Sequence, residues 1–217
     1  MSTQQLALGL LKPRLQALDN FVAGPNGSAL AAVRELAAAR GPQFLYLWGP
    51  EGSGRTHLLT ALGTAAGVPA YRGPGGLYAV DDVHRLDQQG QARLFALLNE
   101  VRSDPAARLV AAGDAPPAKL ALRDDVRTRL AWGLALSLQV LSEQDKADAL
   151  RAQARQHGAR LSSDLIAYML THFPRDMRTL AAALEALDAY GLQQRRALTV
   201  PLLREWLQVH DSRMPNE

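Results

Sequence analysis

A glycine-rich loop, Gly49 to Thr56, lies between a predicted strand and a predicted helix. Phe44–Trp48 is a continuous apolar run, typical of a buried strand, and residues 56–66 have the pattern of a helix that ends at Gly67. The loop matches the phosphate-binding pattern G-x-x-x-x-G-K-[ST], except that Arg55 replaces the lysine. Glycines let successive backbone N–H groups turn toward one anion, and the following helix adds the positive end of its dipole. The loop therefore predicts a nucleotide-binding α/β fold.

The loop supplies most of the candidate cofactor contacts. Thr56 carries the hydroxyl that reaches Mg²⁺ in this motif. Arg55 keeps the positive charge of the usual lysine but has a bulkier planar fork, which favours binding of ADP or ATP over accurate placement of a γ-phosphate. A glycine-rich turn without a ligand is the alternative, and the flanking strand and helix argue against it. The predicted cofactor-binding residues of the loop are Pro50, Glu51, Gly52, Ser53, Gly54, Arg55, Thr56 and His57.

Acidic residues follow two further predicted strands. Asp81 and Asp82 come directly after the apolar run Leu77–Val80, where a phosphate-loop protein has its magnesium-coordinating acid. We expect Asp81 to bind Mg²⁺ through water and Asp82 to orient an attacking water as a catalytic residue. Asp114, after the strand at residues 108–112, is expected to point toward the γ-phosphate. Each acid alone is also ordinary strand-end or turn chemistry, so the prediction depends on the loop upstream.

Strands alternate with helices in the first part of the chain, and only helices follow. The predicted strands are residues 44–48, 68–71, 77–80, 108–112 and 135–140. This alternation predicts a parallel sheet flanked by helices, of fold class α/β. Ser142 is a predicted N-cap, and four helices are expected after it. We therefore predict an N-terminal arm at residues 1–26, an α/β nucleotide-binding domain at residues 27–141 and an all-α domain at residues 142–217.

The composition is that of an ordinary soluble protein. It is 47% hydrophobic and 21% charged, has no cysteine and has no apolar run near the roughly 20 residues of a membrane span. We expect a cytoplasmic protein with no membrane contact and no signal peptide. The net charge of +3 does not demand nucleic-acid binding. Direct DNA binding stays an open alternative, through arginines of the helical region: Arg151, Arg155, Arg160, Arg195 and Arg196.

Two other arginines are candidates for phosphate contacts. Arg129 lies before the last predicted strand, where it could act in trans on a neighbour's nucleotide as an arginine finger. A solvated basic face is the alternative for Arg129. Arg178, near the start of a helix, could reach back to the bound phosphates, and a surface arginine is the alternative there. The five histidines show no metal-binding spacing and are expected to be structural or solvated.

Local matches along nearly the whole chain resemble the Hda family, the AAA+, DnaA-related inactivators of bacterial replication initiation. In that family arginine in the phosphate loop is usual. Residues 5–10 are similar to the family's clamp-binding peptide, with Gln5, Leu6, Leu8 and Leu10 as the docking residues, although Gly9 stands where proline is more common. The other matches are residues 45–57, residues 113–117 (sensor 1), residues 129–133 (arginine finger) and residues 175–180 (sensor 2).

The resemblance implies a regulator whose catalysis takes place at a partner's nucleotide. Bound to ADP and tethered to the DNA-loaded sliding clamp (the polymerase β subunit), such a protein uses its arginine finger, here Arg129, to make DnaA hydrolyse ATP, which prevents re-initiation. It implies little or no intrinsic ATPase and a lid at residues 142–217. The alternatives are a self-sufficient DnaA-like or helicase-loader ATPase of replication, and a non-enzymatic adaptor. Whether the chain forms a homo-oligomer stays open.

One departure from the family is large. Between the loop's helix and Leu77 the family usually has a strand, a helix and a further loop, whereas here only residues 67–76 fill the gap. We therefore expect the sheet to lack one element beside its core strands.

Overall fold

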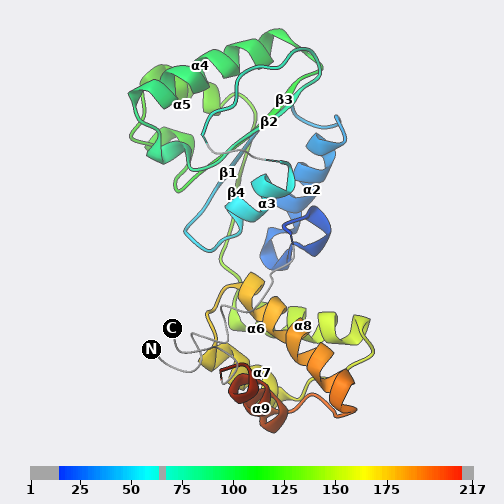
Figure 1. The fold of residues 1–217 in the computed structure, drawn as a ribbon. Helices are drawn as coiled ribbons and strands as arrows, with labels where there is room; N and C mark the ends of the chain where they lie inside the picture. Colours follow the sequence, from blue (N-terminus) through cyan, green and yellow to red (C-terminus); the bar gives the residue numbers. More distant parts are fainter. Residues whose placement is uncertain (1–14, 64–66, 212–217) are drawn as a thin grey trace. The chain divides into compact units, whose positions relative to one another are not determined.

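The structure, a computed structural model of the 217-residue chain, describes residues 15–63 and 67–211 (Figure 1). The chain divides into two compact units whose boundary lies between Val140 and Leu141. Among the described residues, no helix is long and apolar enough to cross a membrane.

The first unit is built on a parallel sheet. Its described strands are β1 (Phe44–Trp48), β2 (Leu77–Val80), β3 (Arg108–Gly113) and β4 (Leu134–Ser137), in the order β2-β3-β1-β4. All neighbouring strands pair in parallel, so their carboxyl ends share one edge of the sheet. The predicted α/β class is confirmed, and β1 with its phosphate loop occupies a central position.

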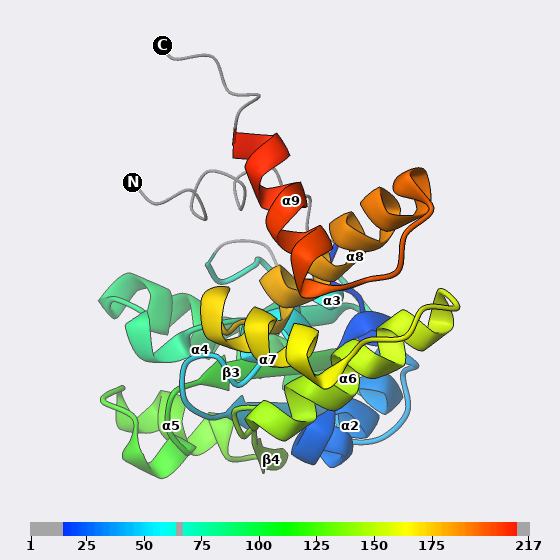
Figure 2. The ribbon, with the colours of Figure 1, turned by 90° about the horizontal axis from the view of Figure 1, so that it is seen from below.

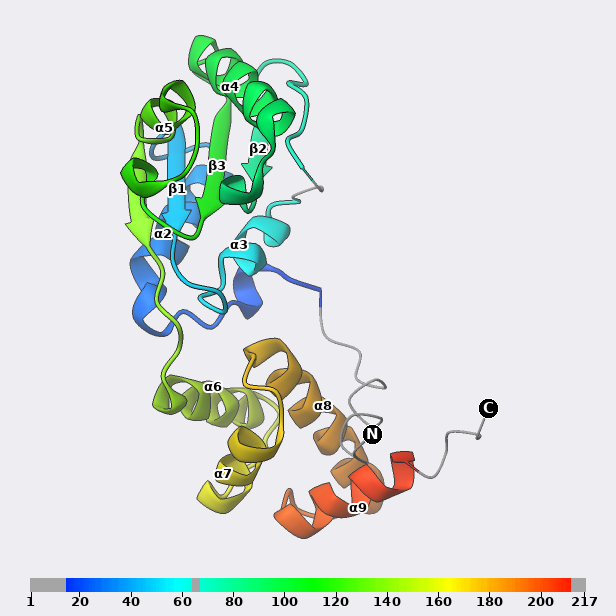
Figure 3. The same cartoon turned by 90° about the vertical axis from the view of Figure 1, so that its left-hand side faces the viewer.

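Helices cover both faces of the sheet (Figure 3). One face packs against α2 (Gly27–Ala37) and α3 (Arg55–Ala61), and the other against α4 (Gln88–Ser103) and α5 (Asp124–Leu130). Side chains alternate between these faces along β1: Leu45 and Leu47 point to the α2/α3 core, and Phe44 and Tyr46 to the α4/α5 core. Burial on both faces explains why the strands are continuously apolar in sequence.

The short segment before β2 is a loop. The predicted strand at residues 68–71 is wrong, because the structure places this stretch outside the sheet. Two bonds to one carboxylate hold the loop: the Tyr71 hydroxyl and the Gly75 N–H donate to Asp104 Oδ2 at 3.0 and 2.8 Å. The Tyr71 ring also stacks on Tyr78 of β2, with ring centroids 5.7 Å apart. Aromatic stacking and one carboxylate therefore anchor the segment in place of a strand.

Part of the predicted arm is folded. Within the predicted arm, residues 18–20 and 24–26 form 3-10 helices. His57 of α3 fastens this segment, since its Nε2 lies 3.0 Å from both the Ala17 carbonyl oxygen and Asn20 Oδ1. Residues 15–26 are thus tied to the helix that follows the phosphate loop.

The second unit is a bundle of four described helices, α6 (Glu143–Gln156), α7 (Ser163–His172), α8 (Met177–Gln194) and α9 (Val200–Asp211) (Figure 2). Both α6 and α9 pack against α7 and α8 around buried leucines. Ser142, Ser162 and Asp176 are N-caps whose side-chain oxygens accept backbone N–H bonds, as the sequence predicts for Ser142.

Candidate functional site

The phosphate loop leaves β1 at the carboxyl edge of the sheet. Gly52 and Gly54 have φ angles of +79° and +97°, a left-handed conformation that glycine adopts without steric cost. Gly49 is required for space, because an added Cβ would lie 2.3 Å from the Leu138 carbonyl oxygen. The loop is therefore a glycine-dependent turn whose backbone approaches its neighbours closely, as a phosphate cradle requires.

The side chain of Arg55, in the phosphate loop, is buried beside Asp82. This side chain is 9% exposed, and its Nη2 lies 3.6 Å from Asp82 Oδ1. Its Nη1 is buried without a hydrogen-bond partner among the described residues, and the same holds for Ser53 Oγ. Buried polar groups in native proteins are nearly always hydrogen-bonded. Two orphaned polar atoms in one phosphate loop therefore fit a bound anion as their missing partner.

The strand-end acids lie where the sequence predicts. Asp82 has a left-handed backbone, with φ of +48°, which turns the chain sharply after β2. The Asp81 carboxylate accepts the N–H of Asp82 at 2.8 Å. Asp114 follows β3, whose last residue, Gly113, accepts the N–H of Gly49 at 3.3 Å. The structure thus brings the phosphate loop and the ends of β2 and β3 to one place.

Tyr46 holds the segment that follows β3 by a hydrogen bond. Its hydroxyl donates to the Ala115 carbonyl at 2.8 Å, one residue beyond Asp114. Burial raises the pKa of the Tyr46 phenol and the nearby Asp114 carboxylate raises it further, while the Arg55 charge lowers it. The phenol therefore stays protonated and works as a fixed hydrogen-bond donor in this site.

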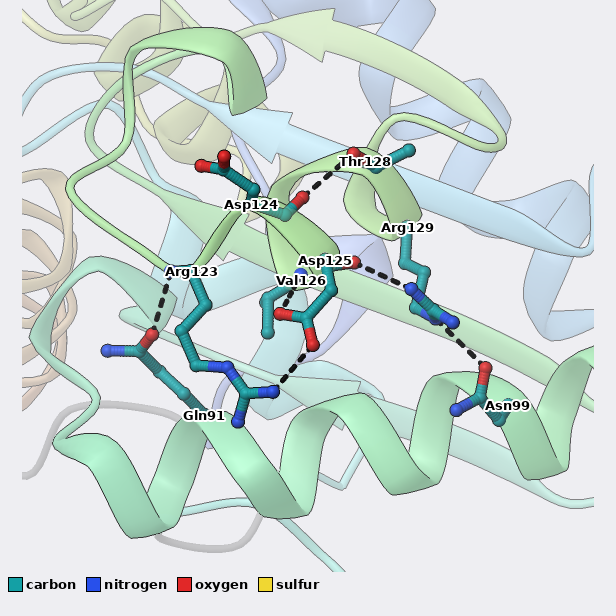
Figure 4. Close-up of polar contacts among 8 residues, drawn as sticks. All are labelled: Gln91, Asn99, Arg123, Asp124, Asp125, Val126, Thr128 and Arg129. Carbon is teal, nitrogen blue, oxygen red and sulfur yellow. Dashed lines mark hydrogen bonds and ion pairs between the residues drawn. The ribbon is translucent and has the colours of Figure 1, made fainter.

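Arg129 is held in a defined position on α5. Its Nε donates to Asn99 Oδ1 at 2.9 Å and its Nη1 to the Asp125 carbonyl at 3.0 Å (Figure 4). Its guanidinium carbon lies 4.0 Å from the Phe95 ring centroid and 5.2 Å from that of Trp132. Cation–π contacts of this kind stabilise a guanidinium by about 0.5–1 kcal/mol at exposed sites. The side chain is therefore pre-organised, which a randomly solvated arginine is not.

Two further arginines make cation–π contacts with the same two rings. The guanidinium carbon of Arg102 lies 5.1 Å from the Trp132 ring centroid, and that of Arg123 lies 5.7 Å from the Phe95 ring centroid. Three guanidinium groups and two rings thus alternate along the surface of α4. The Trp132 ring also meets Phe44, the first residue of β1, with centroids 5.7 Å apart. Arg129 therefore lies near the amino ends of the strands, at the opposite edge of the sheet from its own phosphate loop.

The remaining predicted residues belong to other parts of the chain. Arg178 is exposed in the first turn of α8 in the helical unit, so its contact with a nucleotide stays a prediction. The clamp-binding residues Gln5, Leu6, Leu8 and Leu10 lie outside the described residues.

Two family models match parts of the chain. One is described as Hda, lid domain, and matches residues 143–207; the other is the bacterial DnaA ATPase domain and matches residues 11–72. Domain III of the replication initiation protein DnaA from Thermotoga maritima is similar in fold, with a TM-score of 0.62 and 20% identity over 90% of this chain and 96% of that one. The chain is an Hda/DnaA-like AAA+ protein.

Other AAA+ proteins share the fold at lower identity. AMPPCP-bound DnaA from Aquifex aeolicus has a TM-score of 0.62 and 19% identity over 86% of this chain and 70% of that one. A variant of RuvB from Thermotoga maritima has a TM-score of 0.62 and 14% identity over 92% of this chain and 73% of that one. These likenesses establish the two-part AAA+ fold.

A histidine also belongs to the site of this AAA+ protein, although the sequence predicts no role for it there. His84, expected to be structural or solvated, has an imidazole only 16% exposed, and its Nδ1 lies 4.0 Å from Asp82 Oδ1 and 3.9 Å from Asp114 Oδ1. This Nδ1 is buried without a hydrogen-bond partner among the described residues. The signal in the sequence was its position two residues after Asp82, but only the left-handed turn at Asp82 brings the imidazole back over the strand ends.

The expected magnesium ligands are compatible with the motif but are few. Thr56 is exposed at the start of α3, and the Asp81 carboxylate already accepts a backbone N–H. A hydroxyl and a carboxylate are oxygen ligands of the type Mg²⁺ prefers. Within residues 15–63 and 67–211, no group of three or more His, Asp or Glu side chains is arranged to hold a metal. Thr56 and Asp81 would thus hold Mg²⁺ only together with phosphate oxygens and water.

Proposed function

We propose that this protein is a nucleotide-bound AAA+ regulator that, together with the DNA-loaded sliding clamp, stimulates ATP hydrolysis by DnaA and so prevents re-initiation of replication. The observation that carries the proposal is the pre-organised Arg129, held by Asn99 and two aromatic rings at the sheet edge opposite the chain's own phosphate loop. A guanidinium fixed there serves a phosphate on another molecule.

The nucleotide site belongs to this proposal. Ser53 Oγ and Arg55 Nη1 are buried polar atoms that a phosphate oxygen would satisfy. The AMPPCP-bound DnaA of similar fold supports an adenine nucleotide, and we propose ADP as the resting one. When bound, the nucleotide supplies the negative charge that matches Arg55 and fixes the conformation of the loop.

Arg129 is suited to act in trans because two of its three guanidinium nitrogens are held by hydrogen bonds within the chain. Its described hydrogen bonds engage Nε and Nη1, and its guanidinium carbon lies over two rings. Nη2 is thus the nitrogen through which it would meet a partner's phosphate. An arginine finger stabilises the charge that develops during phosphoryl transfer and raises kcat by about 10³–10⁵.

The intrinsic ATPase of the chain is proposed to be weak. Arg55 Nη2 lies 3.6 Å from Asp82 Oδ1, so the loop's cation faces the carboxylate expected to orient a water. That pairing would hold Asp82 as a counter-ion. A self-sufficient ATPase is the second candidate, favoured by the same nearness of Asp82 to the phosphate loop. Steady-state phosphate release by the purified chain alone separates the two, since the second candidate requires turnover without DnaA.

The clamp and the initiator are proposed partners. The peptide with Gln5, Leu6, Leu8 and Leu10 would dock spaced leucines into an apolar pocket of the clamp. Gly9 leaves this peptide with more conformational freedom than proline would, so its ordering on binding costs more entropy.

The test compares Arg129→Ala with a matched control on the same helix. Arg127 pairs with the exposed Asp124 and contacts neither ring, so Arg127→Ala removes an equal charge nearby. We expect Arg129→Ala to fold and bind ADP but to reduce stimulation of DnaA hydrolysis by about 10³-fold. Arg127→Ala should retain stimulation. Full stimulation by Arg129→Ala would overturn the proposal.

A further inference from the structure

We propose that His84 donates a hydrogen bond to the terminal phosphate of a bound nucleoside triphosphate, so that it contributes to ATP affinity and not to ADP affinity. The proposal rests on the nucleotide site proposed above. It concerns a residue that belongs to neither the phosphate loop nor the strand-end acids.

The geometry places His84 at the phosphate end of the site. Arg55 Nη2 and His84 Nδ1 approach the same oxygen, Asp82 Oδ1, at 3.6 and 4.0 Å. Because Arg55 belongs to the loop, this shared oxygen places the imidazole directly beside the cradle. His84 Nδ1 also lies 3.9 Å from Asp114 Oδ1, so it is located between the carboxylates that follow β2 and β3.

The imidazole Nδ1 of His84 makes no hydrogen bond with a described residue. Both distances to carboxylate oxygens exceed the roughly 3.2 Å limit of a good N–H···O bond. The nitrogen is nevertheless buried, and it lacks a hydrogen-bond partner among the described residues. Such an atom normally has a protein, water or ligand partner. Ser53 Oγ and Arg55 Nη1 share this condition, so three of the four orphaned atoms in the described part of the chain belong to one site.

Charge explains why this nitrogen would discriminate between nucleotides. Asp82 and Asp114 present negative charge beside the cradle, and like charges repel an additional phosphate. Arg85 also faces Asp82, at 3.4 Å, but its side chain is 70% exposed and its effect is screened by solvent. His84 is the donor located between the two carboxylates. Without it, a terminal phosphate beside these two carboxylates would have, among the described residues, only the loop's Arg55 and the exposed Arg85 to offset their charge, whereas a diphosphate held by the loop would be unaffected.

The test is calorimetric titration of the full-length protein, freed of co-purified nucleotide, with ADP and with AMPPCP. We expect His84→Ala to weaken AMPPCP binding by about tenfold or more, because a hydrogen bond to a charged group contributes about that much to affinity. ADP binding should change by less than about twofold. His84→Gln, which keeps a side-chain N–H donor, should recover part of the loss. Arg85→Ala is the control and should leave the ratio of the two affinities unchanged.

A second variant keeps the test open if His84→Ala fails to fold. Asp114 is exposed, so Asp114→Asn should fold, and by removing one repelling carboxylate it should tighten AMPPCP binding relative to ADP. Equal weakening of both ligands by His84→Ala, or no weakening, would overturn the role of His84, as would an unchanged affinity ratio in Asp114→Asn. Failure of the wild-type protein to bind either ligand would instead refute the nucleotide site itself.

Discussion

Replacing Gly113 with alanine should destabilise the α/β unit through one identifiable collision. A Cβ at Gly113 would lie 2.2 Å from the Tyr46 hydroxyl oxygen. Tyr46 is 1% exposed, and its hydroxyl is fixed by the 2.8 Å bond to the Ala115 carbonyl, so the ring has little room to retreat. Overpacking of this kind costs about 1–3 kcal/mol, and disturbing the hydrogen bond adds about 1 kcal/mol. We expect Gly113→Ala to lower the free energy of unfolding by about 2–4 kcal/mol.

Removing the hydroxyl should relieve the collision. In Gly113→Ala combined with Tyr46→Phe, the nearest neighbours of the new Cβ would be Val83 Cγ2 and the ring carbon Cζ of residue 46, at 3.2 and 3.3 Å. Tyr46→Phe alone should cost about 1–2 kcal/mol, because it leaves the Ala115 carbonyl without its donor. The double variant should therefore be less destabilised than the sum of the single variants by about 1–2 kcal/mol.

The assay is urea unfolding of the three variants, followed by tryptophan fluorescence. The control is Gly27→Ala in α2, where an added Cβ meets nothing within 4 Å and helix propensity favours alanine. That variant should be neutral or slightly more stable. Additive effects of Gly113→Ala and Tyr46→Phe would show that the Tyr46 hydroxyl is not the obstacle.

Two further predictions concern the segments that frame the site. Asn26 is 2% exposed and exchanges two 2.8 Å hydrogen bonds with the backbone of Gln139, so Asn26→Ala should cost about 1–3 kcal/mol in urea unfolding. Asn26→Asp should cost at least as much, because one carboxylate oxygen would face the Gln139 carbonyl oxygen. The N–H of Gly75 lowers the pKa of Asp104, with help from the Tyr71 hydroxyl. Its folded pKa is therefore below the ordinary value of about 3.9, and its stabilisation is present above that value and lost as the pH falls through the folded pKa. The Tm difference between wild type and Asp104→Asn should thus be largest near neutral pH and should shrink in acid; a constant difference would contradict this.

The sequence predicts those parts of the fold that depend on local pattern. β1 and β2 are recognisable because burial on both faces makes them continuously apolar, and Ser142 is recognisable because its side chain caps the next helix. The phosphate loop is recognisable because its glycines are needed for backbone conformation, independently of distant contacts.

Features that depend on distant contacts were not predictable. The seven-residue α5 has only Val126 and Leu130 buried, too few for a clear helical period. The position of Arg129 depends on Phe95 and Asn99 of α4, about 30 residues away in sequence. Val68–Tyr71 has the apolar character of a strand, but the bond from Tyr71 to Asp104 holds it as a loop.

The proposed function requires that catalysis occurs at the nucleotide of DnaA. The most direct measurement is phosphate release in two reconstituted mixtures with DNA-loaded clamp. One combines DnaA with Asp82→Asn, a variant of this chain that keeps Arg55 but lacks the carboxylate expected to orient an attacking water; the other combines the wild-type chain with a DnaA disabled in its own phosphate loop. We predict phosphate release above the DnaA background in the first mixture, provided that Arg129 is intact, and none in the second. Release in the second mixture, with none above background in the first, would contradict the account.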